Sequence, residues 1–513
     1  MPEESPRSLR RDLWSPILIA LVMALTALWP GDVSWLLDEP RLIAAGWHAN
    51  HVGQIAVGGL YGNFGIRYGP LPTQIYQVLL LVTHDPIALV VLRSLLCAGV
   101  CGFGLLWLGR SLGLPGWFAA AALASPYVVA YQRVLWDASF AMPGGVLALA
   151  GLADFLRTGR AWPLRIAVLA AVLDPTIHPQ TLPLSVSVLG WLAWQHRAAL
   201  WKDRRALGVL GLLVLALNGF YLVQFAGQLF ARLGGSVQKG YPGTSSHWLS
   251  ALAPLLGGRL LAGAEYLDNL ARPSAPAAIR TFAKACIYLF YPLAWLGICL
   301  AAKQVWQILR TQKITLDTPP TVSPREALLC VVLGGLILQM LLFGLMRIPA
   351  APQYFFGTFA LHIVVAWFAV DSLRRWKLGA ALGVLYAAGS VLLTTEAASS
   401  IHQHGYERPR WPTLASSVSV ARELNRFSET TALTDVPVYE KSPQALRTLR
   451  LLLPAAGNRP NTNGRLYITN SGAAKPAETT VIELDQHAAP LSGVSSIDIT
   501  PLPKDWVPDP STW

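Results

Sequence analysis

Residues 14–39 read "WSPILIALVMALTALWPGDVSWLLDE", an apolar run that gives way within ten residues to two adjacent carboxylates, Asp38 and Glu39. The apolar part is close to the ~20 residues that an α-helix needs to cross a bilayer. The stretch therefore predicts a first membrane span over 14–30, with an acidic pair a few residues beyond its end.

The composition extends this interpretation to most of the chain. Of the 513 residues, 53% are hydrophobic and only 13% are charged, whereas soluble domains carry roughly 25% charged residues. The net charge of +12 comes from Lys and Arg scattered between apolar runs, a pattern typical of cytoplasmic loops rather than of a nucleic-acid-binding face. We therefore expect a polytopic, all-α membrane protein that contacts membrane lipid and binds no nucleic acid.

Apolar segments along the chain can be assigned as spans, at 14–30, 86–108, 114–130, 140–156, 162–173, 179–195, 206–226, 281–302, 326–346, 353–370 and 378–394. If the N-terminus is cytoplasmic, the cytoplasmic segments (1–13, 109–113, 157–165, 196–205, 303–325 and 371–377) hold 18 Lys and Arg among 67 residues. The external segments (31–85, 131–139, 174–179, 227–280 and 347–352) hold 9 among 130. Because Lys and Arg concentrate on the cytoplasmic side, this distribution predicts about 11 transmembrane helices and an external C-terminus.

Two regions outside the spans are also expected to be structured. The segment "GPLPTQIYQVLLLVTHDP" (69–86) is too short to span and has two prolines near its start, so we place it as an interfacial helix in the first external loop, 31–85. After the transmembrane core, 1–395, the chain contains a helix-like stretch and the strand-like segments "GRLYITN" and "TTVIELD". Residues 396–513 are therefore predicted to form a small external α/β domain.

Polar residues near the predicted outer face are candidates for a functional site. Asp38 and Glu39 precede an amphipathic stretch, Asp137 lies between aromatic residues in "YQRVLWDASF", and His178 lies in the Pro-bracketed turn "LDPTIHPQTLP". A carboxylate at the bilayer surface can have a raised pKa and accept a proton. Each also has a structural interpretation: a solvated acidic pair, a helix N-cap for Asp137 and a simple turn for His178.

Two arginines complete the candidate set. Arg93 lies inside the span 86–108, where a charge is costly unless it snorkels or has an anionic partner. Arg347 follows the ninth span, and Tyr354 starts the tenth. External arginines beside several acids could hold a phosphate next to a proton acceptor.

These motifs, in this order, resemble the GT-C glycosyltransferases. This superfamily includes the protein O-mannosyltransferases of glycosyltransferase family 39, the aminoarabinose-to-lipid A transferases and the oligosaccharyltransferase catalytic subunits. "LLDEPRLIAAG" resembles the family's Asp-Glu opening, "YGPLPTQIYQVLLLV" its Pro-containing interfacial segment and "LRSLL" its Leu-Arg-Leu-Pro. "QRVLWDASF" resembles the acidic motif of the second external loop, and "PQYFFGTFALHIVVAWFAV" the late Arg/Tyr-Pro-like span. The resemblance covers about residues 14–395.

The resemblance implies a multi-pass enzyme of the bacterial inner membrane. With the orientation that the Lys and Arg distribution predicts, its N-terminus is cytoplasmic and its C-terminal domain is periplasmic. It would transfer a sugar, with inversion, from a polyprenyl-phosphate donor to a hydroxyl of a lipid, glycan or protein acceptor at the outer face. The implied roles are Asp38 as the base, Glu39 as its orienter or alternate, Arg347, Arg93 and Tyr354 around the donor phosphate, and Asp137 and His178 in the pocket. Some relatives use a divalent metal, so Mg²⁺ or Mn²⁺ on Asp38, Glu39 and Asp137 stays open.

The sequence also departs from the family pattern. No aromatic residue follows the acidic pair, the interfacial motif reads "PLP", and the second-loop motif is Trp-Asp. The C-terminal part has no "WWDYG"-type motif, which argues against an asparagine-linked oligosaccharyltransferase. Two alternatives stay open: a transporter or flippase of a lipid-linked or anionic substrate, and a catalytically inactive GT-C-like subunit. Polar candidates on one face and no evident repeat favour transfer over transport.

Overall fold

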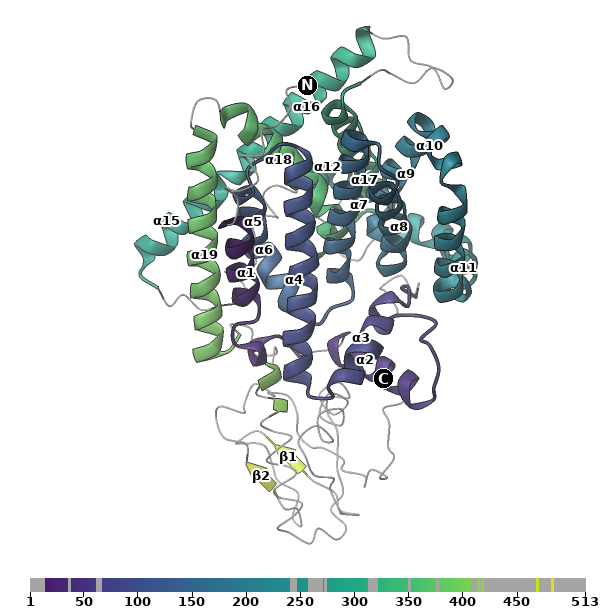
Figure 1. The fold of residues 1–513 in the computed structure, drawn as a ribbon. Coiled ribbons are helices and arrows are strands. Elements are labelled where there is room, and N and C mark those ends of the chain that lie inside the picture. Colours follow the sequence, from purple (N-terminus) through teal and green to yellow (C-terminus); the bar gives the residue numbers. More distant parts are fainter. Residues whose placement is uncertain are drawn as a thin grey trace.

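The computed structural model describes residues 14–35, 38–60, 67–239, 247–256, 271, 275–311, 322–348, 352–374, 378–406, 413–415, 417–418, 467–469 and 481–483 (Figure 1). The helices of the first half are α1 (Trp14–Thr26), η2 (Pro30–Asp32), α2 (Asp38–His51), α3 (Leu71–Val82), α4 (Pro86–Ser111), α5 (Trp117–Leu123), α6 (Pro126–Arg133), η3 (Ala138–Phe140), α7 (Ala141–Thr158), α8 (Ala161–Ile177), η4 (Pro179–Thr181), α9 (Leu182–Gln195), α10 (Arg197–Lys202) and α11 (Arg204–Lys239). Those of the second half are α12 (His247–Leu252), η5 (Ala253–Leu256), α15 (Ala277–Tyr288), α16 (Phe290–Thr311), α17 (Pro324–Met346), η6 (Pro352–Thr358), α18 (Phe359–Arg374) and α19 (Leu378–His404).

Each predicted apolar span contains helix. Among the described residues, seven helical stretches are long and apolar enough to cross a membrane: Pro86–Ser111, Ala138–Thr158, Arg204–Gly227, Ala277–Thr311, Pro324–Met346, Gln353–Leu373 and Leu378–His404. The mostly helical, membrane-type fold is therefore confirmed. The exact number of eleven spans stays a prediction, because helices such as α1 and α9 are shorter than a bilayer requires when upright.

Two predicted spans are broken. The segment 114–130 divides into α5 and α6, and Ser125 between them has a non-helical backbone with ψ 131°. This break follows from Pro126, because a residue that precedes proline avoids the helical region. The segment 281–302 falls on α15 and α16, which meet at Leu289.

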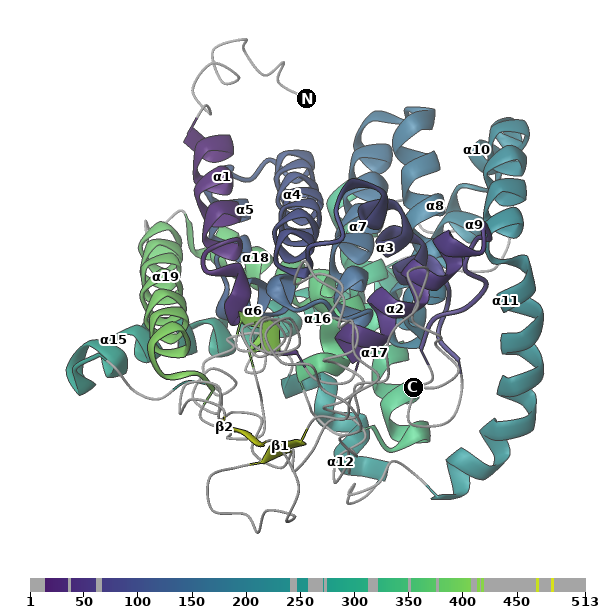
Figure 2. The ribbon, with the colours of Figure 1, turned by 90° about the horizontal axis from the view of Figure 1, so that it is seen from below.

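The centre of the bundle is α7, which packs against both α4 and α8. Of the most apolar window of Ala138–Thr158, 83% of the residues are buried. By contrast, α11 lies at the edge of the bundle in both views (Figures 1 and 2), and only 17% of its apolar window is buried. Its exposed Val209, Leu212 and Phe220 are suited to contact lipid tails, because a bilayer favours apolar side chains on that surface.

The segment 31–85 contains the helices α2 and α3, and α3 coincides with the helix predicted there, while its interfacial position stays a prediction. The two helices pack closely where Gly46 of α2 approaches the backbone of α3 at Gln77. Asn50 donates to the Gln77 carbonyl at 2.9 Å, and the Gln77 amide donates back to Asn50 Oδ1 at 3.1 Å. Because α3 also contacts α4 and α8, this pair of helices covers the ends of both.

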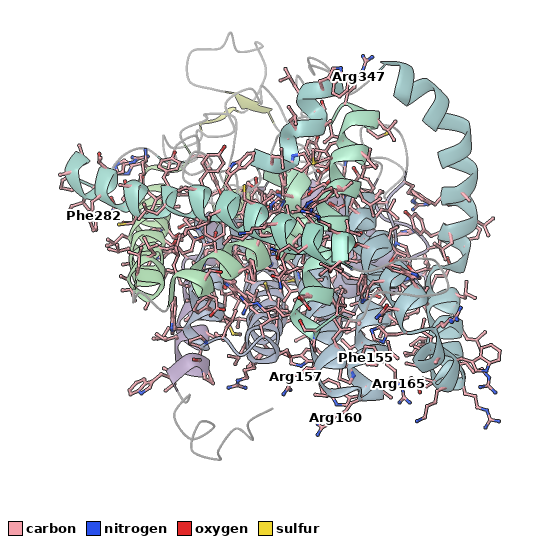
Figure 3. The ribbon with its side chains drawn as sticks, turned by 90° about the horizontal axis from the view of Figure 1, so that it is seen from above. Phe155, Arg157, Arg160, Arg165, Phe282 and Arg347 are labelled. Atoms are coloured by element: carbon pink, nitrogen blue, oxygen red, sulfur yellow. The ribbon has the colours of Figure 1, made fainter. Side chains whose placement is uncertain are left out.

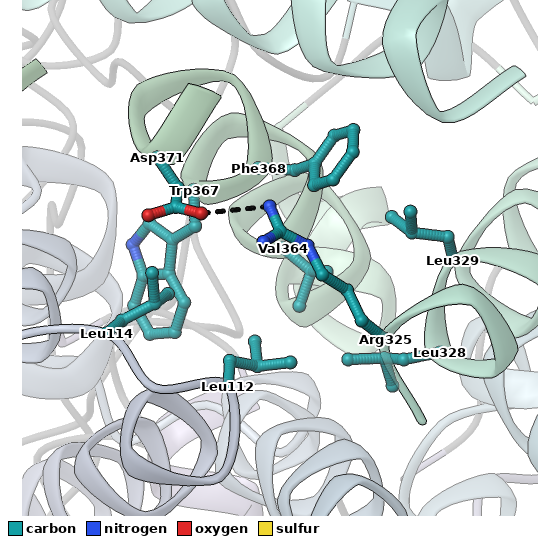
Figure 4. A pocket seen from close by; sticks show the side chains of 9 residues that line it. All are labelled: Leu112, Leu114, Arg325, Leu328, Leu329, Val364, Trp367, Phe368 and Asp371. Atoms are coloured by element: carbon teal, nitrogen blue, oxygen red, sulfur yellow. Dashed lines mark ion pairs between the residues drawn. The ribbon is translucent and has the colours of Figure 1, made fainter. Parts of the chain in front are cut away.

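Segments predicted to share the cytoplasmic face do lie together. Arg165 makes a two-pronged ion pair with Asp203, with distances of 2.7 and 2.6 Å. Arg325 pairs with Asp371 at 2.9 Å (Figure 4). Figure 3 shows Arg160 and Arg165 at one end of the molecule and Arg347 at the other. The grouping of segments by face is thus supported, while the compartment that each face meets stays a prediction.

The Arg325–Asp371 pair lies in a pocket between the ends of α4, α17 and α18 (Figure 4). The lining side chains are Leu112, Leu114, Arg325, Leu328, Leu329, Val364, Trp367, Phe368 and Asp371. They come from the predicted cytoplasmic end. This pocket is therefore separate from the candidate residues near the predicted outer face.

The C-terminal part is described at few positions. β1 (Tyr467–Thr469) and β2 (Val481–Glu483) pair in parallel, with Tyr467 opposite Val481. Both fall in the predicted strand-like segments. Most of the predicted α/β domain lies outside the described residues, so that domain stays a prediction. α19 continues to His404, past the expected boundary at 395.

Candidate active site

Asp38 connects the two loops that are predicted to be the first and second external loops. It is the first residue of α2, where unpaired backbone N–H groups and the helix dipole favour a carboxylate. Its Oδ2 accepts a hydrogen bond from Nε1 of Trp136 at 2.8 Å. Trp136 lies between α6 and η3, 98 residues along the chain. Asp38 itself is only partly buried, so the carboxylate is positioned and still reachable.

Glu39 points to a different partner. It is buried, with 5% of its surface exposed, and its Oε1 accepts from the Ser34 hydroxyl at 3.1 Å. Adjacent side chains on a helix diverge, and here one carboxylate faces Trp136 while the other faces Ser34. The two acids are therefore suited to different tasks, and the solvated-pair interpretation does not describe Glu39.

Asp137 lies next to Trp136 and is buried, with 3% of its surface exposed. Its Oδ1 accepts from the Ala138 N–H at 2.6 Å at the start of η3, which confirms the predicted capping role. Its Oδ2 has no hydrogen-bond partner among the described residues. Burial, together with the negative charge of Asp38, raises the pKa of Asp137 to about 7. A carboxyl group with such a pKa can bind or release a proton near neutral pH.

This shift predicts a pH dependence of stability. Because the pKa of Asp137 rises from 3.8 to about 7 on folding, its protonated form contributes stability below pH 4 that is lost as pH rises through about 7. Asp137→Asn, which cannot ionise, should therefore show a smaller fall in Tm between pH 5 and pH 8 than the wild type. Thermal unfolding in detergent at both pH values measures this difference, and equal falls would contradict the assigned shift.

Aromatic rings fix the position of Trp136. Phe356 contacts the indole edge to face at a centroid distance of 6.2 Å, and Tyr131 stacks on it at 6.3 Å. Phe356 belongs to η6, which also carries the partly buried Tyr354 and packs against η3 and η4. The segment "PQYFFGT", which begins the late motif of the family resemblance, thus packs beside the loops that carry Asp137 and His178.

His178 lies in the turn between α8 and α9. It is buried, its Nδ1 accepts from the Gln180 N–H at 3.3 Å, and its ring is 4.5 Å from that of Tyr68. The neighbouring Gly69 approaches the Thr176 backbone so closely that a Cβ would collide with it. Burial lowers the pKa of His178 to about 3. The side chain is therefore neutral at pH 7 and offers a hydrogen bond, not a positive charge.

Arg93 is fully buried in α4 and faces the loop before α7. Its guanidinium donates to the carbonyls of Tyr131 and Gln132 and to the Ser139 hydroxyl, and it lies 4.8 Å from the Phe140 ring centroid. These acceptors compensate the cost of a buried charge. Arg93 therefore positions the loop that carries Trp136 and Asp137, and its role toward a phosphate stays a prediction.

Arg347 ends α17 in a left-handed conformation with φ 51°. This geometry costs a non-glycine residue about 1–3 kcal/mol and is more frequent at functional sites. The structure thus brings together Asp38, Glu39, Asp137 and the loops of His178 and Tyr354. The position of Arg347 relative to these residues stays a prediction.

The carboxylates do not converge on a metal position. Among the described residues, no group of three His, Cys, Asp or Glu side chains could hold a metal ion. Asp38 faces Trp136, Glu39 faces Ser34, and Asp137 caps η3. This donor set does not fit a three-ligand Mg²⁺ or Mn²⁺ site, which normally needs several oxygens around one point.

Several residues of the site were not predicted as such. Trp136 could have been proposed from the sequence, because an indole N–H usually has a hydrogen-bond acceptor when it is buried, and acidic residues are candidate acceptors. Ser34 and Phe356 gave no local signal. Their importance arises only from contacts made by distant segments, such as the contact between Phe356 and Trp136.

Similarity to known proteins is found in the three-dimensional structure and not in the sequence. No protein-family model matches the sequence, and no curated protein matches it. The apo structure of ArnT, an aminoarabinose transferase from Cupriavidus metallidurans, matches with a TM-score of 0.52 and 15% identity, over 86% of this chain and 84% of that one. The chain has the GT-C fold.

Two further solved structures match this chain less well. ArnT from Cupriavidus metallidurans bound to undecaprenyl phosphate has a TM-score of 0.46 at 15% identity, over 86% of this chain and 84% of that one. The arabinosyltransferase EmbB from Mycobacterium smegmatis has a TM-score of 0.39 at 13% identity, over 93% of this chain and 46% of that one. The predicted resemblance is confirmed for the fold by the match to the apo ArnT structure.

Proposed function

We propose that the protein is an integral-membrane glycosyltransferase that transfers a sugar from a polyprenyl-phosphate donor to an acceptor hydroxyl at the outer face of the membrane. The observation that carries this proposal is the Asp38–Trp136 contact. It joins two acidic loops at the end of a GT-C bundle, next to the segment that carries Tyr354. Such a site would meet both the lipid-soluble donor and a water-exposed acceptor.

In the proposed reaction, Asp38 accepts the proton of the acceptor hydroxyl as its oxygen attacks the anomeric carbon. A new carbon–oxygen bond forms there, and the bond from that carbon to the phosphate oxygen breaks. The bonding electron pair leaves with polyprenyl phosphate, whose charge Arg347 stabilises. Attack opposite the leaving group inverts the anomeric carbon. Trp136 and Glu39 hold Asp38 and its helix end in position.

The proposed topology has eleven spans, a cytoplasmic N-terminus and an external C-terminal α/β domain, in the bacterial inner membrane. Ion pairs support the grouping of faces: Arg165 with Asp203, and Arg325 with Asp371, each join segments assigned to the same side. The 18-to-9 distribution of Lys and Arg supports the direction. A divalent metal is not part of the proposed mechanism.

The test is sugar transfer by the full chain reconstituted in lipid. Synthetic polyprenyl-phosphate sugars are supplied one at a time together with candidate lipid, glycan and peptide acceptors, and the formation of glycosylated acceptor is measured. We expect transfer from at least one donor, with strong loss in Asp38→Asn. Movement of intact donor between leaflets without transfer would support a flippase instead, and would overturn the proposal.

Trp136→Phe should lower turnover about tenfold, because it keeps an aromatic ring beside Phe356 but removes the N–H that positions Asp38, together with one ring of the indole. The smaller ring leaves a small cavity, so the Tm should fall by a few °C in this variant and in its control alike. The matched control is Trp107→Phe, which alters an indole stacked on Trp162 at the predicted cytoplasmic end. Equal turnover losses in both variants would contradict a specific role of the Trp136–Asp38 bond.

A further inference from the structure

The end of α19 reaches the start of the first external loop. Nδ1 of His402 lies 3.0 Å from Oδ2 of Asp32, and the imidazole stacks on the Trp29 ring at 4.8 Å with an interplanar angle of 11°. Two residues past the helix, the Tyr406 hydroxyl donates to the Asp32 carbonyl at 2.8 Å. Asp32 is therefore held through both its side chain and its backbone.

The chain that follows keeps contact with this loop. The Leu414 N–H donates to the Val33 carbonyl at 2.9 Å, and Ser34 forms a β-bridge with Thr413. Gly31 lies so close to this chain that a Cβ there would be 2.8 Å from Cβ of Ala415. Only glycine fits at position 31 without a shift of the neighbouring chain. The β-bridge to Thr413 also brings this chain to Ser34, the residue that binds Glu39.

The opposite side of the loop is held from α6. Arg133, at the end of α6, donates from one amino group to the carbonyls of Leu28 and Trp29 at 2.7 and 3.0 Å. Trp29 has a left-handed backbone with φ 46°, a conformation that persists in a bulky residue only when its surroundings impose it. The loop 28–34 is therefore clamped between the chain before Trp136 and the chain after α19.

We propose that His402 and Tyr406 are positioning residues for the acidic pair. Through Asp32 they fix Val33 and Ser34, and Ser34 in turn binds Glu39 at 3.1 Å, next to Asp38. The end of α19 and the chain just beyond it thus act in the proposed reaction by setting the distance between the acidic end of α2 and the loop that carries Trp136. This inference rests on the proposed transferase function.

The test uses the full chain in lipid with four variants. Tyr406→Phe removes only the hydroxyl that binds Asp32, and His402→Ala removes the imidazole. His402→Asn places an amide nitrogen near the Nδ1 position and should restore the contact. His404→Ala is the matched control, because Nδ1 of that histidine contacts the Ser400 carbonyl, 3.3 Å away within α19, and not the loop.

Two readouts separate positioning from general structure. In His402→Ala and in Tyr406→Phe, kcat should fall about five- to tenfold, with the donor KM changed less than twofold, because misplacement of the base affects the chemical step. His402→Asn should recover most of this loss, and His404→Ala should match the wild type. Amide hydrogen exchange in residues 31–39 should become about tenfold faster in the first two variants, while α7 stays protected.

Hydrogen exchange keeps this proposal distinct from the proposed function, since it needs no activity. Faster exchange of residues 31–39 in a protein that transfers no sugar would leave the clamp in place and overturn the transferase. Unchanged exchange and unchanged kcat in both Tyr406→Phe and His402→Ala would overturn the clamp. A kcat loss of the same size in His404→Ala would also overturn it.

Discussion

Asp38→Asn is expected to lower turnover about 10²–10⁴-fold, the usual contribution of a positioned base. The amide oxygen of the asparagine can still accept the hydrogen bond from Trp136, and the side chain keeps nearly the same volume. Folding and the donor KM should therefore be preserved. Initial rates of sugar transfer, with Tm measured in parallel, give both quantities. This is the largest effect expected of any single substitution in the chain.

Two neighbouring substitutions act as controls for the base. Asp38→Glu should retain little activity, because one extra methylene displaces the carboxylate by about 1 Å from the position that Trp136 sets. Glu39→Gln should be milder, since an amide can still accept from Ser34. Near-normal turnover of folded Asp38→Asn would transfer the role of base to Glu39 or to Asp137, whose pKa of about 7 suits it.

Arg347→Ala is expected to weaken use of the donor about ten- to hundredfold, because a charge-assisted hydrogen bond contributes ~1.5–3 kcal/mol. The change should appear as a higher donor KM or Kd measured with a synthetic polyprenyl-phosphate sugar. Arg347→Lys should recover only part of the loss, since lysine lacks the planar fork of donors.

The left-handed backbone of Arg347 offers a sharper control. With φ at 51°, Arg347→Gly should relieve backbone strain, so that Tm stays equal or rises while donor binding is lost as in Arg347→Ala. Loss of donor binding without loss of stability would assign the effect to the guanidinium. Unchanged donor binding in both variants would remove Arg347 from the site.

Local sequence patterns predicted the helices and the general place of the site. The apolar runs predicted the helical bundle, because the length of a hydrophobic run determines whether a helix can span a bilayer. The prolines before "TQIYQVLLLV" predicted the start of α3, because proline favours the first turn of a helix. The order of the predicted spans also placed Asp38, Asp137 and His178 near the same face of the membrane. Proline also explains the break at Pro126 that the span assignment missed.

Contacts between distant segments could not be predicted. Nothing in residues 31–39 indicates that Trp136 donates to Asp38, or that His402 binds Asp32 across 370 residues. The buried setting of Arg93 is similar: its sequence context indicates a costly charge in a span, and only the fold supplies the carbonyls of Tyr131 and Gln132 as partners. Such pairings depend on the packing of whole helices.

The most direct measurement follows the donor phosphorus by ³¹P NMR, with the purified full chain in lipid and polyprenyl-phosphate sugars supplied one at a time. In the donor the phosphate is a diester, and breakage of the bond to the sugar makes it a monoester. We predict conversion of the diester to the monoester signal, matched by glycosylated acceptor, and at least a hundredfold slower conversion in Asp38→Asn. Equal conversion by wild type and Asp38→Asn, or none by the wild type with any donor, would contradict a transferase that uses this site.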